Sequence, residues 1–199
     1  MLPDSLAVLE RELRRESLFT TPVYEKLSTY LNELERWSGK LNLTSLEGEE
    51  LVRRLVVDPV KIGRQLQMSG TLLDIGSGNG SPGIPLHVSL GLETVHLVES
   101  RSKRAAFLRH IASLIDPKKI WVHKTRVEDL DAEIERIDWF SMQAVVPTAG
   151  LLEPLRRWAR ATTRIVWITN VDSAPIRGAT RVMKDDGKVG GWVFRLDQS

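Results

Sequence analysis

The chain has 199 residues, with 28 Lys and Arg against 26 Asp and Glu, and it contains no cysteine. The absence of cysteine excludes disulfides, thiolate nucleophiles and cysteine-based metal sites. The four histidines are not spaced like metal ligands, so we expect no metal. No apolar run approaches the roughly 18 residues of a membrane span, and the N-terminal stretch is highly charged. We therefore expect neither a span nor a signal peptide, and we expect a cytoplasmic monomer.

The first part of the chain is predicted to be helical. Apolar residues recur at helical spacing in residues 5–16 and 23–37, and Gly39 is predicted to end the second helix. A third helix is predicted over residues 49–66, with Pro59 producing a kink or a break. We expect residues 1–66 to form a helical cap that is integral to the fold.

From residue 71 onward, predicted strands alternate with predicted helices. The strands cover 71–75, 94–98, 120–123, 139–145 and 164–169, and the helices cover 83–90, 103–115, 128–134 and 150–161. This alternation predicts an α/β fold with a mostly parallel sheet and helices on both faces. We expect residues 67–199 to form this core, which would end in a hairpin of strands 177–183 and 192–196.

The segment LLDIGSGNGSPGIPL, residues 72–86, fits two cofactor templates. Gly78 to Gly83 spells the G-x-G-x-x-G turn of a dinucleotide site, and Asp74 to Gly80 spells the D-x-G-x-G-x-G turn of S-adenosylmethionine enzymes. Both kinds of site place an acid at the end of the second strand, where it binds the ribose hydroxyls. Glu99 stands at that place.

Two features of this segment favour S-adenosylmethionine. Ser81-Pro82 separates the turn from the helix that would hold a pyrophosphate, and Asp74 suits a cationic sulfonium better than an anion. Glu128 and Asp129 follow the third predicted strand, where a carboxylate would bind an adenine amine. They suit a helix N-terminus equally well. A nicotinamide-dependent oxidoreductase remains the alternative at this point.

Basic residues gather in three groups, within residues 101–126, 156–164 and 177–188. Each group suits a solvated face of the protein. Together they indicate a polyanionic partner such as a nucleic acid.

Three segments resemble the RsmG, or glucose-inhibited division protein B, family of bacterial methyltransferases that act on small-subunit ribosomal RNA. YLNELERWSGKLNLTS resembles the family's pattern of Trp, Lys and Asn-Leu-Thr, matched here by residues 37, 40 and 42–44. The glycine turn matches together with the Pro-Gly-Ile-Pro that follows it. ESRSKRAAFLR resembles the family's acid, Lys-Arg pair and aromatic-leucine helix.

The resemblance implies a Rossmann-like class I methyltransferase fold, S-adenosylmethionine as cofactor, and methyl transfer to N7 of a guanine in small-subunit ribosomal RNA. Phosphate contacts would come from the basic groups. The resemblance implies catalytic positions at Gln143 and Asn42. It implies cofactor contacts at Asp74, Gly76, Ser77, Gly78, Asn79, Gly80, Pro82, Glu99, Ser100, Val127 and Glu128.

The chain departs from the family pattern on the side where RNA is expected. Met142-Gln143-Ala144 stands where the family has Ser-Arg-Ala, and Thr169-Asn170 stands where it has Lys-Gly. In the third predicted helix, Arg54-Leu55 and Asp58-Pro59 replace Arg-His and Asp-Ser. The alternative function is therefore a diverged relative that binds the cofactor but has lost or changed its methylation target.

Overall fold

The computed structural model describes residues 2–131, 133–134, 136–170, 178–183 and 189–196, and these contain a seven-stranded sheet in the order β3-β2-β1-β4-β5-β7-β6. Neighbouring strands from β3 to β5 are parallel, and β7 runs antiparallel to both β5 and β6. The predicted mostly parallel sheet is confirmed. The strands are β1 (Thr71–Ile75), β2 (Thr94–Val98), β3 (Ile120–His123), β4 (Trp139–Gln143), β5 (Arg164–Asn170), β6 (Thr180–Met183) and β7 (Val189–Phe194).

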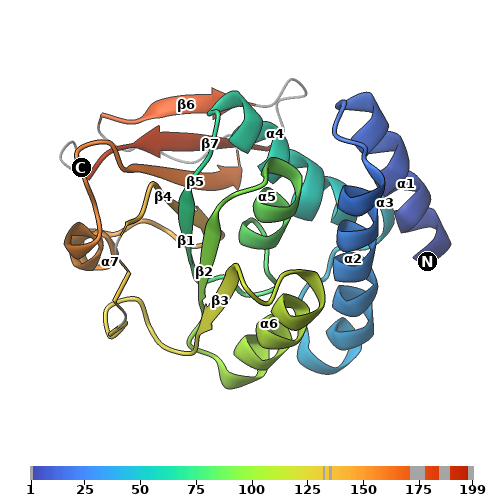
Figure 1. Cartoon of the computed structure of the whole chain (residues 1–199), viewed down its shortest axis with the longest axis horizontal. Coiled ribbons are helices and arrows are strands. Elements are labelled where there is room, and N and C mark those ends of the chain that lie inside the picture. Colours follow the sequence, from blue (N-terminus) through green and yellow to red (C-terminus); the bar gives the residue numbers. More distant parts are fainter. Residues whose placement is uncertain (1, 132, 135, 171–177, 184–188, 197–199) are drawn as a thin grey trace.

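Helices cover both faces of the sheet (Figure 1). One face carries α5 and α6, with α2 packed outside both of them, and the other carries α7. The helices are α1 (Leu2–Arg15), α2 (Thr21–Leu41), α3 (Gly48–Val52), α4 (Asp58–Gln65), α5 (Gly83–Leu90), α6 (Ser102–Ile115) and α7 (Ala149–Leu152). A π-helical turn, η1 (Arg53–Val57), joins α3 to α4, and a 3₁₀ turn, η2 (Glu153–Arg157), follows α7.

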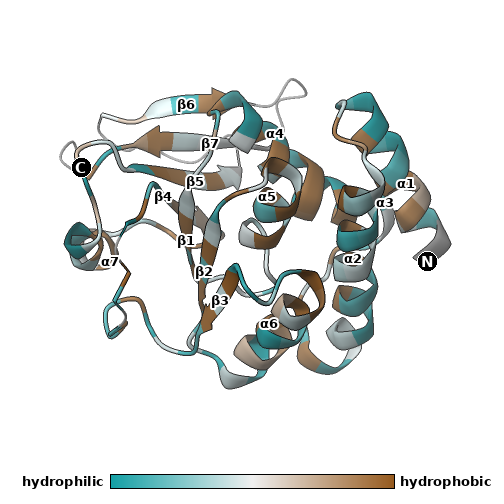
Figure 2. Cartoon of the chain, in the orientation of Figure 1, coloured by the Kyte–Doolittle hydropathy of each residue, from teal (hydrophilic) through white to brown (hydrophobic). Residues whose placement is uncertain are grey.

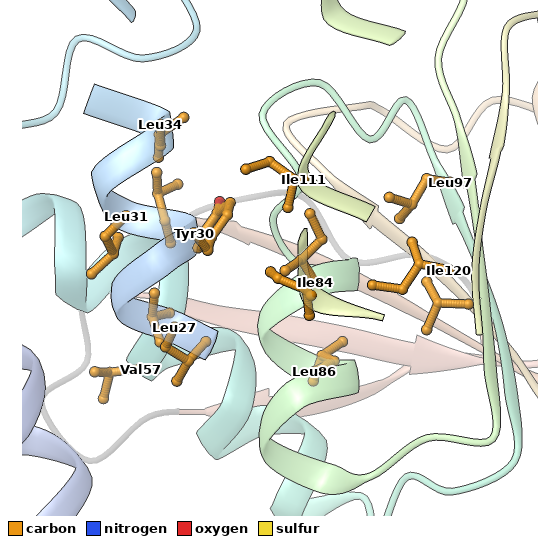
Figure 3. Close-up of a cluster of buried hydrophobic side chains, with 14 of the residues drawn as sticks. Leu27, Tyr30, Leu31, Leu34, Val57, Ile84, Leu86, Leu97, Ile111 and Ile120 are labelled. Atoms are coloured by element: carbon orange, nitrogen blue, oxygen red, sulfur yellow. The ribbon is translucent and has the colours of Figure 1, made fainter. Parts of the chain in front are cut away.

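The main hydrophobic core lies between the sheet and α2. Tyr30 of α2 points toward Ile84 of α5, whereas Leu31 lies on the other side of α2, and α5 in turn covers the sheet (Figure 3). The central strands are mostly hydrophobic, and hydrophilic residues mark the outer turns of α2 and α6 (Figure 2). This pattern is typical of parallel strands that are buried on both faces.

Helix α2 continues past the point where the sequence predicted its end. Thr20 caps its start by accepting a hydrogen bond from the Val23 amide, at 3.3 Å. Its end is set by Asn42, which has φ 48° and donates its amide hydrogen to the Ser38 carbonyl. The prediction that Gly39 ends the helix was wrong, because a lone glycine in a helix costs only about 1 kcal/mol. Asn42 provides the left-handed cap instead.

The predicted third helix has a π-helical turn just before Pro59. The Asp58 amide bonds to the Arg53 carbonyl, five residues earlier. Pro59 has no N–H, so it gives no hydrogen bond to the carbonyls of Arg54 and Leu55. Both carbonyls instead accept hydrogen bonds from side chains of the site described below.

Three other predicted boundaries were wrong. In place of a helix over 128–134, residues 126–130 form turns in which the amides of Asp129 and Leu130 bond to carbonyls three residues back. The helix predicted over 150–161 becomes 3₁₀ from Glu153, because Pro154 cannot continue the α-helical hydrogen bonds. Strand β4 ends at Gln143, since Ala144 turns the chain with φ 59°.

The C-terminal hairpin is confirmed in its described part, where β6 pairs with β7 in antiparallel fashion. Residues 177 and 184–188, which were included in the predicted strand and turn, lie outside the described residues.

Candidate functional site

The glycine turn joins β1 to α5 at the carboxyl end of the sheet. The amides of Gly76 and Ser77 both donate to the Val98 carbonyl of β2, at 2.9 and 3.0 Å. Gly76 and Gly78 have φ of 70° and 51°, a region that favours glycine. The Ser77 hydroxyl donates to the Asp74 carbonyl at 2.9 Å. These bonds fasten the turn to the ends of the two strands.

Glu99 supports this turn from the end of β2. Its side chain is buried, and its Oε2 accepts from the Gly78 amide at 3.1 Å. Its Oε1 accepts from the Arg101 amide at 2.7 Å. Because each carboxylate oxygen has a second lone pair, Glu99 keeps the capacity to accept hydrogen bonds from a ligand.

Asp74 lies beneath the turn and is fully buried. Its Oδ1 accepts from the Ser141 hydroxyl at 2.6 Å, while Oδ2 lies beside Gly83 without a hydrogen bond of standard geometry to a described residue. Burial raises the pKa of Asp74 to about 6, although the hydrogen bonds oppose that rise. A nearby cation would favour the charged form of this carboxyl.

Above the turn lies a cleft of about 380 Å³, a size typical of small-molecule sites. Its charged lining residues among those described are Arg54 and Arg104, so the cleft is positive. An Arg104 guanidinium nitrogen lies 3.7 Å from where a Gly78 Cβ would stand. The lining comprises Leu43, Thr44, Leu46, Arg54, Leu55, Gly76, Ser77, Gly78, Asn79, Ser81, Arg104, Gln143, Ala144 and Val145.

Ser81 and Gln143 connect the glycine turn to the π-helical turn. The Ser81 hydroxyl lies 2.8 Å from the Leu55 carbonyl and 2.9 Å from Gln143 Oε1, and its one proton serves one acceptor at a time. Gln143 Nε2 donates to the Arg54 carbonyl at 3.3 Å. Both carbonyls belong to the π-helical turn, and neither can accept a hydrogen bond from Pro59, which has no N–H. The amide of Gln143 is therefore engaged at both ends.

Tyr30 connects α2 to the same turn. Its buried hydroxyl donates to the Asn79 carbonyl at 3.1 Å, and burial raises its pKa, so it stays protonated. Asn79 in turn donates to the Leu43 carbonyl at 3.5 Å. Asn42, predicted as catalytic, is an exposed helix cap outside the cleft lining, whereas Leu43 and Thr44 line it.

The residues predicted after β2 and β3 are not among those that line the cleft. Ser100 and Glu128 are exposed, and Val127 is buried. Arg157 of η2 holds the turn that carries Val127 and Glu128, because its Nη2 donates to their carbonyls at 2.8 and 3.4 Å. Its guanidinium also lies 3.9 Å above the Trp158 ring.

Four of the predicted cofactor residues, Gly76, Ser77, Gly78 and Asn79, therefore line one cleft together with Gln143, whereas Gly80 and Pro82 do not line it. Asp74 and Glu99 lie beside the turn that forms its floor. The sequence reasoning missed Ser81, Tyr30, Ser141 and Arg157, of which Tyr30 was recognisable only as a core residue. Within the described residues, no group of three or more His, Cys, Asp or Glu is arranged to hold a metal ion. No described helix is both long and apolar enough to cross a membrane.

Sequence comparison connects the chain with ribosomal RNA methyltransferases. A family model described as GidB, rRNA small subunit methyltransferase G, matches residues 23–184. The ribosomal RNA small subunit methyltransferase G of Xanthomonas euvesicatoria is 36% identical over 156 residues, which cover 76% of this chain and 71% of that protein. The protein of the same name from a Roseiflexus species is 32% identical over 172 residues, covering 83% and 74%.

Structural comparison gives the same fold class. A methyltransferase from Aquifex aeolicus, described as dependent on S-adenosylmethionine, aligns with a TM-score of 0.58 and 17% identity, covering 72% of this chain and 91% of that one. Mycoplasma capricolum TrmK, solved with S-adenosylhomocysteine, aligns with a TM-score of 0.53 and 13% identity, covering 73% and 70%. The predicted Rossmann-like class I methyltransferase fold is confirmed.

Proposed function

Since the chain belongs to the rRNA small subunit methyltransferase G family, we propose that it transfers a methyl group from S-adenosylmethionine to N7 of a guanine in small-subunit ribosomal RNA. The observation that carries this proposal is the glycine turn held by Glu99 below a positive cleft. The turn offers a close approach for a nucleoside, and the cleft offers a path for a polyanion.

The residues around the turn fit this cofactor. A Cβ at Gly76 would stand 2.8 Å from Val145, so only glycine keeps the floor of the cleft open there. We assign Glu99 to the ribose hydroxyls, because it is a fixed acceptor next to the turn. Asp74 would favour the cationic end of the cofactor. Further contacts fall to Ser77, Gly78, Asn79, Gly80, Pro82, Ser100, Val127 and Glu128.

Methylation at N7 requires little acid–base chemistry from the protein. The bound cofactor supplies an activated methyl group, and N7 of guanine already carries a lone pair. The protein therefore acts mainly by alignment and by electrostatic support. Arg54 and Arg104, both in the cleft lining, would bind RNA phosphates. Gln143 would fix the π-helical turn that carries Arg54, and Asn42 would fix the end of α2 next to Leu43.

The alternative is a relative that binds the cofactor without methylating ribosomal RNA. A methyl-transfer experiment distinguishes it from the proposed function, which predicts the following result. Purified protein should bind S-adenosylmethionine and transfer labelled methyl groups to small ribosomal subunits or to their naked RNA. It should not transfer them to large subunits. Binding without transfer to any ribosomal RNA would favour the alternative.

The proposed substrate also has consequences for partners and location. A ribosomal RNA substrate places the protein in the cytoplasm of a bacterial cell. We propose that it acts as a monomer and without a metal ion. Size-exclusion chromatography with light scattering tests the first point, and methyl transfer in the presence of a chelator tests the second.

A further inference from the structure

A second hollow lies between α2 and α6, apart from the cleft. It has a volume of about 170 Å³ and is lined by Arg36, Trp37 and Lys40 of α2 and by His110 of α6. Ligand clefts commonly measure about 300–1,000 Å³. The hollow is therefore too small for a whole cofactor and suits one group of a larger ligand.

The aromatic lining of the hollow is held in place. The Trp37 ring lies 5.8 Å from the Phe107 ring and 5.4 Å from the His110 ring, centroid to centroid. Glu33 Oε2 accepts from Trp37 Nε1 at 3.2 Å and from His110 Nε2 at 2.7 Å. Because these bonds fix both rings, Trp37 and His110 present a preformed surface.

The rim of the hollow is basic. Glu33 is mostly buried, and its other oxygen lies 3.3 Å from Arg36. The carboxylate of Glu33 therefore interacts with three side chains. Although burial opposes it, hydrogen bonding from His110, Arg36 and Trp37 lowers the pKa of Glu33. Lys40 is exposed and forms no ion pair with a residue in the described part of the chain. Cations beside an aromatic surface suit a phosphate and a base together.

The hollow lies within reach of a strand that enters the cleft. Arg104, which lines the cleft, precedes His110 by six residues on α6, a distance of about 9 Å along the helix axis. Lys40 stands just before Leu43 and Thr44, which also line the cleft. Arg104 and His110 also lie about 120° apart around α6, so the path between them is roughly 13 Å. A nucleic acid strand advances by about 3.4 Å per nucleotide when stacked, so about four nucleotides span the distance.

We propose that this hollow binds one nucleotide of the ribosomal RNA substrate, about four positions from the methylated guanine. Its base would lie against Trp37, and its phosphate would lie between Arg36 and Lys40. The inference rests on the proposed function, because it takes the occupant of the cleft to be RNA.

Lys40→Glu tests the phosphate contact. Lys26→Glu is the control, since Lys26 also lies on α2, outside the three basic groups and about 21 Å from Lys40 along the helix axis. Lys40→Glu should weaken binding to small-subunit ribosomal RNA at least tenfold. It should also reduce the slope of log affinity against log salt by about 0.7–0.9. Lys26→Glu should change neither quantity, and neither variant should change the affinity for S-adenosylmethionine.

Trp37→Ala tests the base contact and should weaken RNA binding by about 5-fold to 150-fold. Its melting temperature is measured alongside, because Trp37 packs on Phe107. Guanosine monophosphate should compete only weakly, since one subsite binds it. Competition as strong as that of RNA would assign the hollow to a free nucleotide and overturn the proposal.

These outcomes distinguish a failure of the subsite proposal from a failure of the proposed function. If wild-type protein methylates ribosomal RNA but Lys40→Glu binds RNA with the wild-type affinity and salt slope, the subsite is overturned and the function stands. If the wild type neither binds nor methylates ribosomal RNA, both proposals fail.

Discussion

Asp74 and Glu99 lie at the carboxyl ends of two adjacent parallel strands, but their carboxylates have different hydrogen-bond partners. Glu99 accepts two backbone amide hydrogens, which fix the position of its carboxylate. Asp74 is fully buried and has one close side-chain donor, Ser141. One carboxylate is therefore a fixed acceptor, whereas the other becomes charged more readily once a cation lies nearby.

Glu99→Ala should weaken S-adenosylmethionine binding by about 1–3 kcal/mol, because it removes a hydrogen-bonded charged partner. It also frees the Gly78 amide, which adds to the loss. Isothermal titration calorimetry measures the affinity, with the exposed Glu93→Ala as control. Unchanged affinity in Glu99→Ala would remove Glu99 from the cofactor site.

Asp74 should make stability depend on pH. Its native pKa, about 6, exceeds its ordinary value of 3.8, so the folded state holds the proton more tightly. This stabilisation is complete below about pH 4 and is lost as the pH rises through 6. Relative to Asp74→Asn, the wild type should lose on the order of 3 kcal/mol across that range. Urea unfolding at pH 4 and pH 7 measures the difference, and a constant difference would refute the assignment.

At the scale of elements, η1 and the turn after β3 each accept side-chain hydrogen bonds from residues that are distant in the sequence. Gln143 and Ser81 bond to η1, while Arg157 of η2 bonds to the turn at 126–130. Each contact joins segments that are far apart in the sequence. The shape of the site therefore depends on elements that carry none of the expected cofactor contacts.

Arg157→Ala should loosen the turn that carries Val127 and Glu128. We expect the affinity for S-adenosylmethionine to fall by about 1 kcal/mol, or roughly fivefold, because two carbonyls lose their donor. Arg126→Ala, an exposed change in the same turn, should have little effect. Equal affinities for the wild type and Arg157→Ala would show that the hydrogen bonds of Arg157 to this turn do not contribute to cofactor binding.

The elements that the sequence predicted well are those set by local pattern. Buried parallel strands are continuous apolar runs, and β1, β2 and β3 were predicted at their observed bounds. The ends of α2 and α7 were missed because capping by Asn42 and the effect of Pro154 compete with helical periodicity. The π-helical turn was missed because its carbonyls accept hydrogen bonds from Ser81 and Gln143, which are distant in the sequence.

The residues of the site were likewise predicted where their pattern is local and missed where their contacts are distant in the sequence. The glycine turn and Glu99 were visible because their spacing is local to β1 and β2. The roles of Tyr30 and Arg157 depend on contacts across 49 and 30 positions of sequence, and no pattern within a short window reveals them. Asn42 was taken as a site residue because it lies in a matched segment, whereas its immediate neighbours line the cleft.

At the scale of the whole molecule, α2 links the N-terminal helices to the site. It packs on α5 and α6, and it bonds to the glycine turn through Tyr30. Its C-terminal end carries Lys40 and leads into Leu43 and Thr44 at the cleft. We propose that residues 1–66 cover the site as a cap and guide the RNA into it. The division at residue 66 remains a prediction.

The most direct test of the central claim is nucleoside analysis of small-subunit ribosomal RNA. Small subunits that lack 7-methylguanosine are incubated with the protein and S-adenosylmethionine, and their RNA is digested and analysed by mass spectrometry. We predict one new 7-methylguanosine per subunit with the wild type and a strongly reduced yield with Glu99→Ala. The absence of new 7-methylguanosine, with the protein folded and the cofactor bound, would contradict the account.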